Sequence, residues 1–168
     1  MCVWIVNLKD NRDIKPKNST KSKFEICKGK SVIAFGWAVD KDRISKSWEE
    51  YKEYVIHHYN DSQKDVKAFQ KAVNAFEEMK PGDYVWTRDP EKKEYYICEI
   101  LSDFEPSVFR TLEDYDISVF RNCKYKKVGL LKEATNKISW RNLISRSTAR
   151  KINNPAVIAE TKRLVGEI

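Results

Sequence analysis

The sequence has few of the residues that build metal sites, disulfide frameworks and phosphate-binding loops. Among 168 residues it contains four cysteines, two histidines and five glycines. The cysteines are widely separated with no Cys-x-x-Cys pair, and the histidines, His57 and His58, are adjacent. We therefore expect reduced thiols, as in cytoplasmic proteins, and no zinc site. The small number of glycines agrees with the lack of a phosphate-cradling motif, and we expect no metal and no cofactor.

Long hydrophobic runs are also missing. No stretch approaches the length needed to cross a membrane, and the N-terminal MCVWIVNLKD is apolar for only a few residues. It lacks the basic lead and cleavage site of a signal peptide. A cytoplasmic location without a membrane partner is the expectation.

The chain carries no recognisable catalytic arrangement. It has no Ser–His–acid or Cys–His signature. Asp83, Asp89 and Glu99, with Lys93, do not follow the D…ExK order of metal-dependent nucleases and fit turn chemistry better. We expect a binding protein rather than an enzyme, with a nuclease as a minority alternative.

Positive charge is plentiful and lies towards the two ends of the chain. The formal net charge is +7. Residues 126–168 hold ten Lys and Arg against three Glu, residues 9–30 hold eight against three acids, and the middle is acidic. Such segregation would attract a polyanion to one side of the molecule. The alternative is a solvated, lysine-rich surface without a partner.

The length fits one domain spanning 1–168 that buries a real core. Hydrophobic periodicity predicts an α+β fold. Strands are expected at 3–6, 31–37, 84–87, 95–101 and 116–125. Helices are expected at 48–59, 66–79 and 140–147, with a last helix that begins at Pro155 after the N-cap Asn154. Trp4 and Trp48 are expected in the core.

The most informative stretch is 79–100, MKPGDYVWTRDPEKKEYYICEI, which predicts two strands joined by a charged turn. Trp86 and Arg88 fall on one face of the first strand because side chains alternate along a strand. An indole beside a guanidinium suits a planar, hydrogen-bonding ligand such as a nucleobase.

Five segments in order, VWIV, IAFGW, MKPGDYVWTRD, YYICEI and DISVFRNCKY, resemble the PUA-like superfamily. Within it the chain is similar to EVE/YTH-like domains at the N-terminus of bacterial modification-dependent restriction proteins of the Mcr and Mrr kind. The resemblance covers nearly the whole chain. It implies a curved mixed β-barrel with flanking helices, on which a basic helical C-terminal segment, 130–168, packs. It also implies an aromatic pocket for a modified base flipped out of the duplex.

Four residues are candidates for that base pocket. Trp37 follows Gly36 at a strand end, where a ligand can approach closely, and relatives carry an aromatic after this strand. Trp86 is the second candidate wall. The resemblance also places edge-reading groups at Asn7 and Asp10 after the first strand. The alternatives are a core role for either tryptophan and ordinary turn formation for Asn7 and Asp10.

Basic residues are candidates for contacts with the nucleic-acid backbone. Arg88 and Arg121 suit phosphate or base-edge contact, or else form ion pairs with Asp83, Asp89 or Asp116. The tail SWRNLISRSTARKINN combines short hydroxyls with cations, as phosphate-binding segments do. Its candidates are Arg146, Ser147, Arg150 and Lys151. A helix cap with exposed charge is the alternative for this tail.

The expected function is recognition of modified, methylated DNA by base flipping, in a restriction or defence context. Any cutting would belong to a fused or separate nuclease or NTPase effector. An RNA-binding module is the first alternative, because the superfamily also binds RNA. A small nucleoside-processing enzyme similar to ASCH-type relatives is the alternative from another class.

Overall fold

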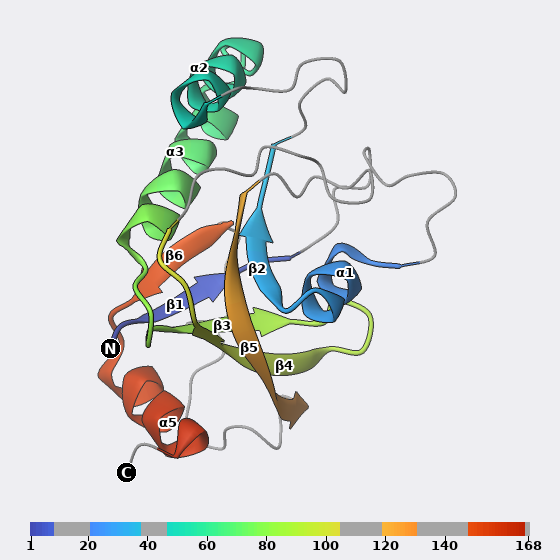
Figure 1. The fold of residues 1–168 in the computed structure, drawn as a ribbon, viewed down its shortest axis with the longest axis vertical. Helices are drawn as coiled ribbons and strands as arrows, with labels where there is room; N and C mark the ends of the chain where they lie inside the picture. Colours follow the sequence, from blue (N-terminus) through green and yellow to red (C-terminus); the bar gives the residue numbers. More distant parts are fainter. Residues whose placement is uncertain (9–20, 38–46, 105–118, 131–147, 167–168) are drawn as a thin grey trace.

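One curled sheet of six strands organises the part of the chain that the structure describes (Figure 1). This structure is a computed structural model, and it describes residues 1–8, 21–37, 47–104, 119–130 and 148–166. The strands are β1 (Val3–Val6), β2 (Val32–Phe35), β3 (Tyr84–Arg88), β4 (Glu94–Ile100), β5 (Val119–Leu130) and β6 (Ala149–Ile152). The helices are α1 (Lys23–Gly29), α2 (Trp48–His58), α3 (Gln63–Glu78) and α5 (Pro155–Val165).

The strand order is β2-β5-β4-β3-β1-β6, and the sheet curls into a half-barrel. β1 and β3 pair in parallel, whereas the other neighbouring strands are antiparallel. Because side chains alternate along each strand, the sheet has an inner face inside the curl and an outer face. Both faces are buried, each in its own hydrophobic core.

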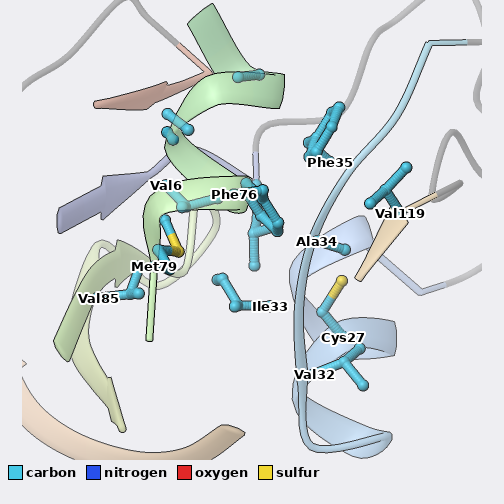
Figure 2. Close-up of a cluster of buried hydrophobic side chains, with 14 of the residues drawn as sticks. Val6, Cys27, Val32, Ile33, Ala34, Phe35, Phe76, Met79, Val85 and Val119 are labelled. Atoms are coloured by element: carbon cyan, nitrogen blue, oxygen red, sulfur yellow. The ribbon is translucent and has the colours of Figure 1, made fainter. Parts of the chain in front are cut away.

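The inner core lies between the strands and α1, α2 and α3. Phe76 and Met79, from the end of α3, lie between Val6 and Val85 on one side and Ile33 on the other (Figure 2). The C-terminal half of α3 thus occupies the space between β2 and the β1–β3 pair. Side chains from the end of α3 therefore fill the interior of the half-barrel (Figure 2).

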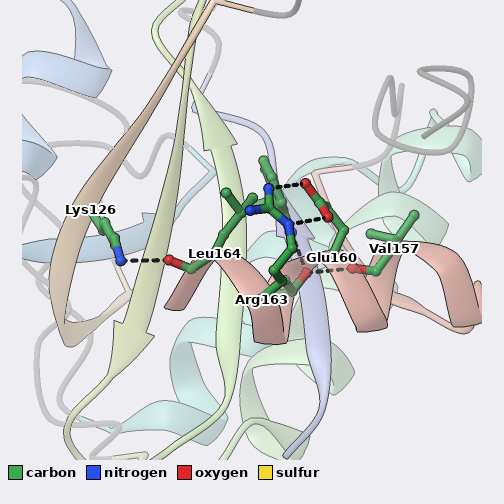
Figure 3. Close-up of polar contacts among 7 residues, drawn as sticks. Lys126, Val157, Glu160, Arg163 and Leu164 are labelled. Carbon is green, nitrogen blue, oxygen red and sulfur yellow. Dashed lines mark hydrogen bonds and ion pairs between the residues drawn. The ribbon is translucent and has the colours of Figure 1, made fainter. Parts of the chain in front are cut away.

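α5 covers the outer face (Figure 3). Its N-cap Asn154 accepts bonds from the backbone N–H groups of Ala156 and Val157, and it ends at Gly166, whose φ of 86° suits glycine. At that end, Lys126 Nζ of β5 donates to the carbonyl oxygen of Leu164 at 2.5 Å. The ammonium group satisfies a carbonyl at the end of the helix and interacts favourably with the helix dipole. β5 thereby anchors the end of α5.

Most of the predicted elements are confirmed. β3 and β4 form the predicted hairpin, α2 and α3 match the two amphipathic patterns, and α5 begins at Pro155 as expected. Trp4 and Trp48 are buried, at 2% and 6% exposure. The second strand is shorter than expected, since β2 covers only Val32–Phe35. The helix predicted at 140–147 lies outside the described residues, as do residues 116–118 of the predicted fifth strand.

Two elements were not predicted. α1 begins at Ser22, which forms a capping box with Glu25, a signal visible in the sequence. β6 pairs with β1 through Lys151 opposite Trp4 and Arg150 opposite Ile5. The predicted basic helical C-terminal segment, 130–168, therefore contains an edge strand of the sheet as well as α5. Among the described helices, none has the length and apolarity needed to cross a membrane.

The junction between α3 and β3 is held by two buried charged groups. Arg121 of β5, 1% exposed, donates from Nη1 to the carbonyl oxygens of Phe76 (2.9 Å) and Met79 and from Nη2 to that of Ser102. Burial lowers the pKa of Arg121, while the nearby carboxylates of Asp103 and Asp83 oppose that shift.

Asp83 is 5% exposed and is bonded from three directions. Its carboxylate accepts from the backbone N–H of Cys2 at 2.6 Å, the indole N–H of Trp4 at 3.0 Å and the backbone N–H of Lys80 at 3.1 Å. The start of the chain is thereby fixed to the turn that follows α3.

Arg121→Ala is expected to lower the free energy of unfolding by about 3–5 kcal/mol, because the three carbonyl oxygens lose a charged donor inside the core. Urea denaturation measures this. Arg88→Ala, which removes an exposed guanidinium of the same type, is the control and should cost less than about 0.5 kcal/mol. Equal effects of the two substitutions would show that Arg121 does not hold the junction.

Candidate nucleic-acid interface

Trp37 stands out among the tryptophans because it is the one of the four described that is not buried. Trp4, Trp48 and Trp86 are 2%, 6% and 0% exposed, whereas Trp37 is half-buried at the end of β2. Its ring packs on the inner core at the rim rather than within it. A half-buried indole that packs against a buried core is a candidate platform for stacking a ligand.

The side chain and the backbone of Trp37 are both held in place. Its ring makes edge contacts with Phe69 of α3, centroids 5.2 Å apart, and with Phe35, 6.1 Å apart. The hydroxyl of Tyr51, from α2, accepts from the Trp37 N–H at 3.1 Å and lies 3.4 Å from the Trp37 carbonyl oxygen, to which it donates. The indole is therefore preorganised by two helices and costs little entropy to use in binding.

An aromatic cluster extends from Trp37 across α2. Tyr51 stacks on Trp48, with ring centroids 5.8 Å apart and planes at 19°, and Phe104 meets Trp48 edge-on at 5.4 Å. Trp48 Nε1 donates to Glu77 of α3 at 2.9 Å, which ties the two helices together. The sequence predicts the helix that carries Tyr51 but not the role of this residue. The Trp48, Tyr51 spacing on one helix face was the available signal.

Trp86 does not share a pocket with Trp37. It belongs to the outer core, is fully buried, and its Nε1 donates to Thr161 Oγ1 of α5 at 2.9 Å. The two tryptophans thus lie on opposite faces of one sheet. The structure therefore does not bring Trp37 and Trp86 together as the two walls of one base pocket, because α5 covers the face on which Trp86 lies.

Arg121 is likewise unavailable to a phosphate. Its guanidinium is enclosed and bonded to backbone carbonyls, and neither Asp83 nor Asp89 forms an ion pair with it. Arg121 holds the end of α3. The sequence predicted either a phosphate or base-edge contact or an ion pair for this residue, and neither includes that role. Asp116, the third candidate partner, lies outside the described residues.

Asn7, Arg88 and Arg150 lie on the outer face. Ile5 of β1 pairs with Arg150 of β6 on one side and with Trp86 of β3 on the other. Asn7, just after β1, comes two residues after Ile5, and Arg88, at the end of β3, comes two residues after Trp86. Asn7 donates its N–H to the carbonyl oxygen of Thr148 at 2.8 Å, and exposed Arg88 lies 5.6 Å from the ring centre of Tyr95. These polar side chains gather where β1 and β3 end.

Trp37 lies at the other end of the strands. β2 runs antiparallel to β5, β5 to β4, and β4 to β3, so the end of β2 points towards the starts of β3 and β1. The structure therefore separates Trp37 from Asn7 and Arg88. Lys151, on edge strand β6, lies nearer the start of β1, with its Nζ 5.2 Å from the Trp4 ring centre. Asp10, Arg146 and Ser147 lie outside the described residues.

Two titratable groups of the inner core have raised pKa values. Burial raises the pKa of the Cys98 thiol and of the Tyr125 hydroxyl well above their ordinary values, so both stay protonated at neutral pH. The four cysteines are free thiols. Among the described residues, no group of three or more His, Cys, Asp or Glu side chains is arranged to hold a metal ion.

Thr161→Val is expected to destabilise the protein by about 1–3 kcal/mol, because it keeps the shape of the side chain and leaves the buried Trp86 N–H without an acceptor. Denaturant unfolding of a double-mutant cycle with Trp86→Phe measures the coupling. The second substitution removes the same N–H, so the two effects should be less than additive. Strictly additive effects would contradict a structural hydrogen bond between β3 and α5.

Comparison with known proteins connects this fold to one family. No curated protein matches the chain. A family model described as Domain of unknown function (DUF8426) matches residues 4–127, from β1 into β5, and includes Trp37, α2 and α3. β6 and α5 follow the matched segment. Since the match covers well over half of the sequence, the chain belongs to the DUF8426 family.

Proposed function

We propose that this chain is a nucleic-acid-binding module that reads a modified base, in DNA rather than RNA, by stacking the base on Trp37. The observation that carries the proposal is the half-buried indole at the end of β2, supported by Phe35 and Phe69 and fixed through its backbone by Tyr51. A flipped base is a flat, polarizable disc, and stacking on an aromatic side chain contributes roughly 1–3 kcal/mol.

The charge of the chain supports a polyanionic ligand. Exposed Lys151 lies on the edge strand, and the net charge is +7. Cations of this kind contact phosphates and position a duplex without reading its sequence. The backbone contacts predicted from the sequence for Arg146, Ser147 and Arg150 remain part of this proposal.

The curled α+β half-barrel is compatible with a PUA-like, EVE/YTH-like module, and membership of that superfamily is part of the same proposal. Such a module would recognise methylated DNA in the cytoplasm and would leave cutting to a fused or separate nuclease or NTPase effector. Burial raises the pKa of the Cys98 thiol and keeps it protonated, and the Arg121 guanidinium is enclosed, which fits binding without chemistry.

Trp37→Ala is expected to weaken binding to a methylated duplex by about tenfold to a hundredfold, since one aromatic wall is lost, while unmodified duplexes bind as before. Trp37→Phe should keep most of the discrimination. Tyr54→Ala, which removes another half-buried aromatic packed on the inner core, is the control. Fluorescence polarisation with matched duplexes measures the binding, and circular dichroism confirms the fold.

Three outcomes would contradict the proposal in different ways. Equal loss on methylated and unmodified duplexes would make Trp37 a structural residue. Tighter binding to matched RNA would make the module an RNA reader. Hydrolysis of free nucleosides that Trp37→Ala abolishes would make the protein an enzyme.

The affinity for duplex DNA is expected to fall steeply with salt, because each phosphate contact releases a counterion. Lys151→Glu should weaken methylated and unmodified duplexes equally and reduce the log–log salt slope by about one. Arg88→Glu makes the same kind of charge reversal at the opposite strand end and serves as the matched control. Titrations at several salt concentrations test this, and a flat dependence would indicate a small neutral ligand.

A further inference from the structure

β5 is much longer than the strand that pairs with it on one side. Its first residues, Val119 to Asn122, pair with all four residues of β2. Its remaining residues, Cys123 to Leu130, pair with β4 on the other side. Within the described residues, no strand lies beside the second half of β5 at the position where β2 would continue. Figure 1 shows this half extending past the start of β2.

The chain itself prevents β2 from continuing there. The residues before β2 form α1, and the backbone turns at Ser31 with a φ of 54°. A non-glycine residue in this left-handed region marks a tight turn. The direction of α1 therefore leaves the edge of β5 without a neighbouring strand from this part of the chain.

The backbone hydrogen bonds of β5 show which of its groups face that edge. Leu101 N donates to the Asn122 carbonyl oxygen at 2.9 Å, and Cys123 N donates to the Ser31 carbonyl oxygen at 2.9 Å. Because the N–H and C=O of one residue point to the same side of an antiparallel strand and alternate along it, Lys124 and Lys126 face β4. Tyr125 and Lys127 present their N–H and C=O groups to the edge that faces away from β4.

The side chains along this edge are strongly basic. Lys124, Lys126 and Lys127 are exposed, and β5 contains four cationic residues and no carboxylate. Lys127 forms an ion pair of 2.6 Å with Glu94 on β4, and Lys126 is bonded to the end of α5. Lysines on an edge strand discourage pairing between identical chains by like-charge repulsion. The same charges attract an acidic strand.

The ladder with β4 is regular from Cys123 to Lys127 and shifts register between Lys127 and Gly129. We propose that the regular part of this edge, from Lys124 to Lys127, receives an extended, acidic segment of a partner protein as an added strand. Backbone hydrogen bonds to Tyr125 and Lys127 would supply affinity, and the three lysines would select acidic side chains. A nucleic acid offers phosphates to the lysines and has no strand of alternating N–H and C=O groups. A second copy of this chain would bring lysine against lysine.

Amide hydrogen exchange tests the edge directly. In the free protein, the Tyr125 and Lys127 amides should exchange fast, while those of Lys124 and Lys126, bonded to β4, exchange slowly. An acetylated and amidated peptide of alternating Glu and Val residues should slow Tyr125 and Lys127. The same peptide with alternate backbone nitrogens methylated, and one with Lys in place of Glu, should bind at least about tenfold more weakly.

One pair of variants separates backbone pairing from charge. Lys127→Pro removes an N–H that forms no native ladder bond, so the fold should remain. Lys127→Gln keeps that N–H, and both variants lose the cation and its contact with Glu94. Peptide affinity should fall by about tenfold more in Lys127→Pro than in Lys127→Gln. Lys126→Pro removes a bond to β4 and should instead destabilise the sheet.

Several results would overturn the proposal. Slow exchange at Tyr125 and Lys127 in the free protein would show that the edge is already paired. Equal peptide affinity of Lys127→Pro and Lys127→Gln would reduce the interaction to charge. Protection of the edge by duplex DNA and not by the peptide would assign it to the nucleic acid. A dimer in analytical ultracentrifugation that Lys127→Pro dissociates would assign it to a second copy.

Discussion

The structure depends on the junction between α3 and β3, where a buried cation and a buried anion hold one turn. Arg121 donates to the last carbonyl groups of α3, and Asp83 accepts from Lys80 and from the first strand. A helix end has unsatisfied carbonyl groups, and a buried guanidinium satisfies several of them at once. The side chains of α3 fill the interior of the half-barrel, so this junction fixes the positions of Phe69 and Phe76. Because the ring of Phe69 contacts Trp37, the junction also supports Trp37.

Burial of both sheet faces restricts where the protein can bind anything. The inner face is filled by three helices, and α5 covers the outer face through Trp86 and Thr161. Of the described sheet, the strand ends and the outer edges then remain for interactions. Trp37 occupies a strand end, and Tyr125 and Lys127 occupy an edge, so both proposals use the positions that the architecture leaves accessible.

Sequence patterns correctly predicted those helices and strands whose formation depends on residues close together in the sequence. The hairpin from Tyr84, the two amphipathic helices and the start of α5 at Asn154 follow from periodicity, turn residues and caps. The roles of Trp86 and Arg121 did not follow, because alternation assigns a side chain to a face without saying what covers that face. β6 also depends on a partner far away in sequence. The pocket role of Trp37 stays a prediction; its side chain is half-buried, whereas the other described tryptophans are buried.

The two proposed sites are far enough apart to act separately in physiological salt. Trp37 follows the part of β2 that is opposite Val119, and Lys127 lies eight residues further along β5, which at about 3.3 Å per residue is roughly 26 Å. The Debye length is about 8 Å at physiological ionic strength and about 30 Å at 0.01 M. An acidic segment bound to β5 would therefore leave the affinity for DNA unchanged at physiological ionic strength. At about 0.01 M salt it would alter that affinity, because charges at one site then act on the other. Coupling that persisted at high salt would have to pass through the packed strand and helices between them, with the Arg121 junction near the start of β5 as its route.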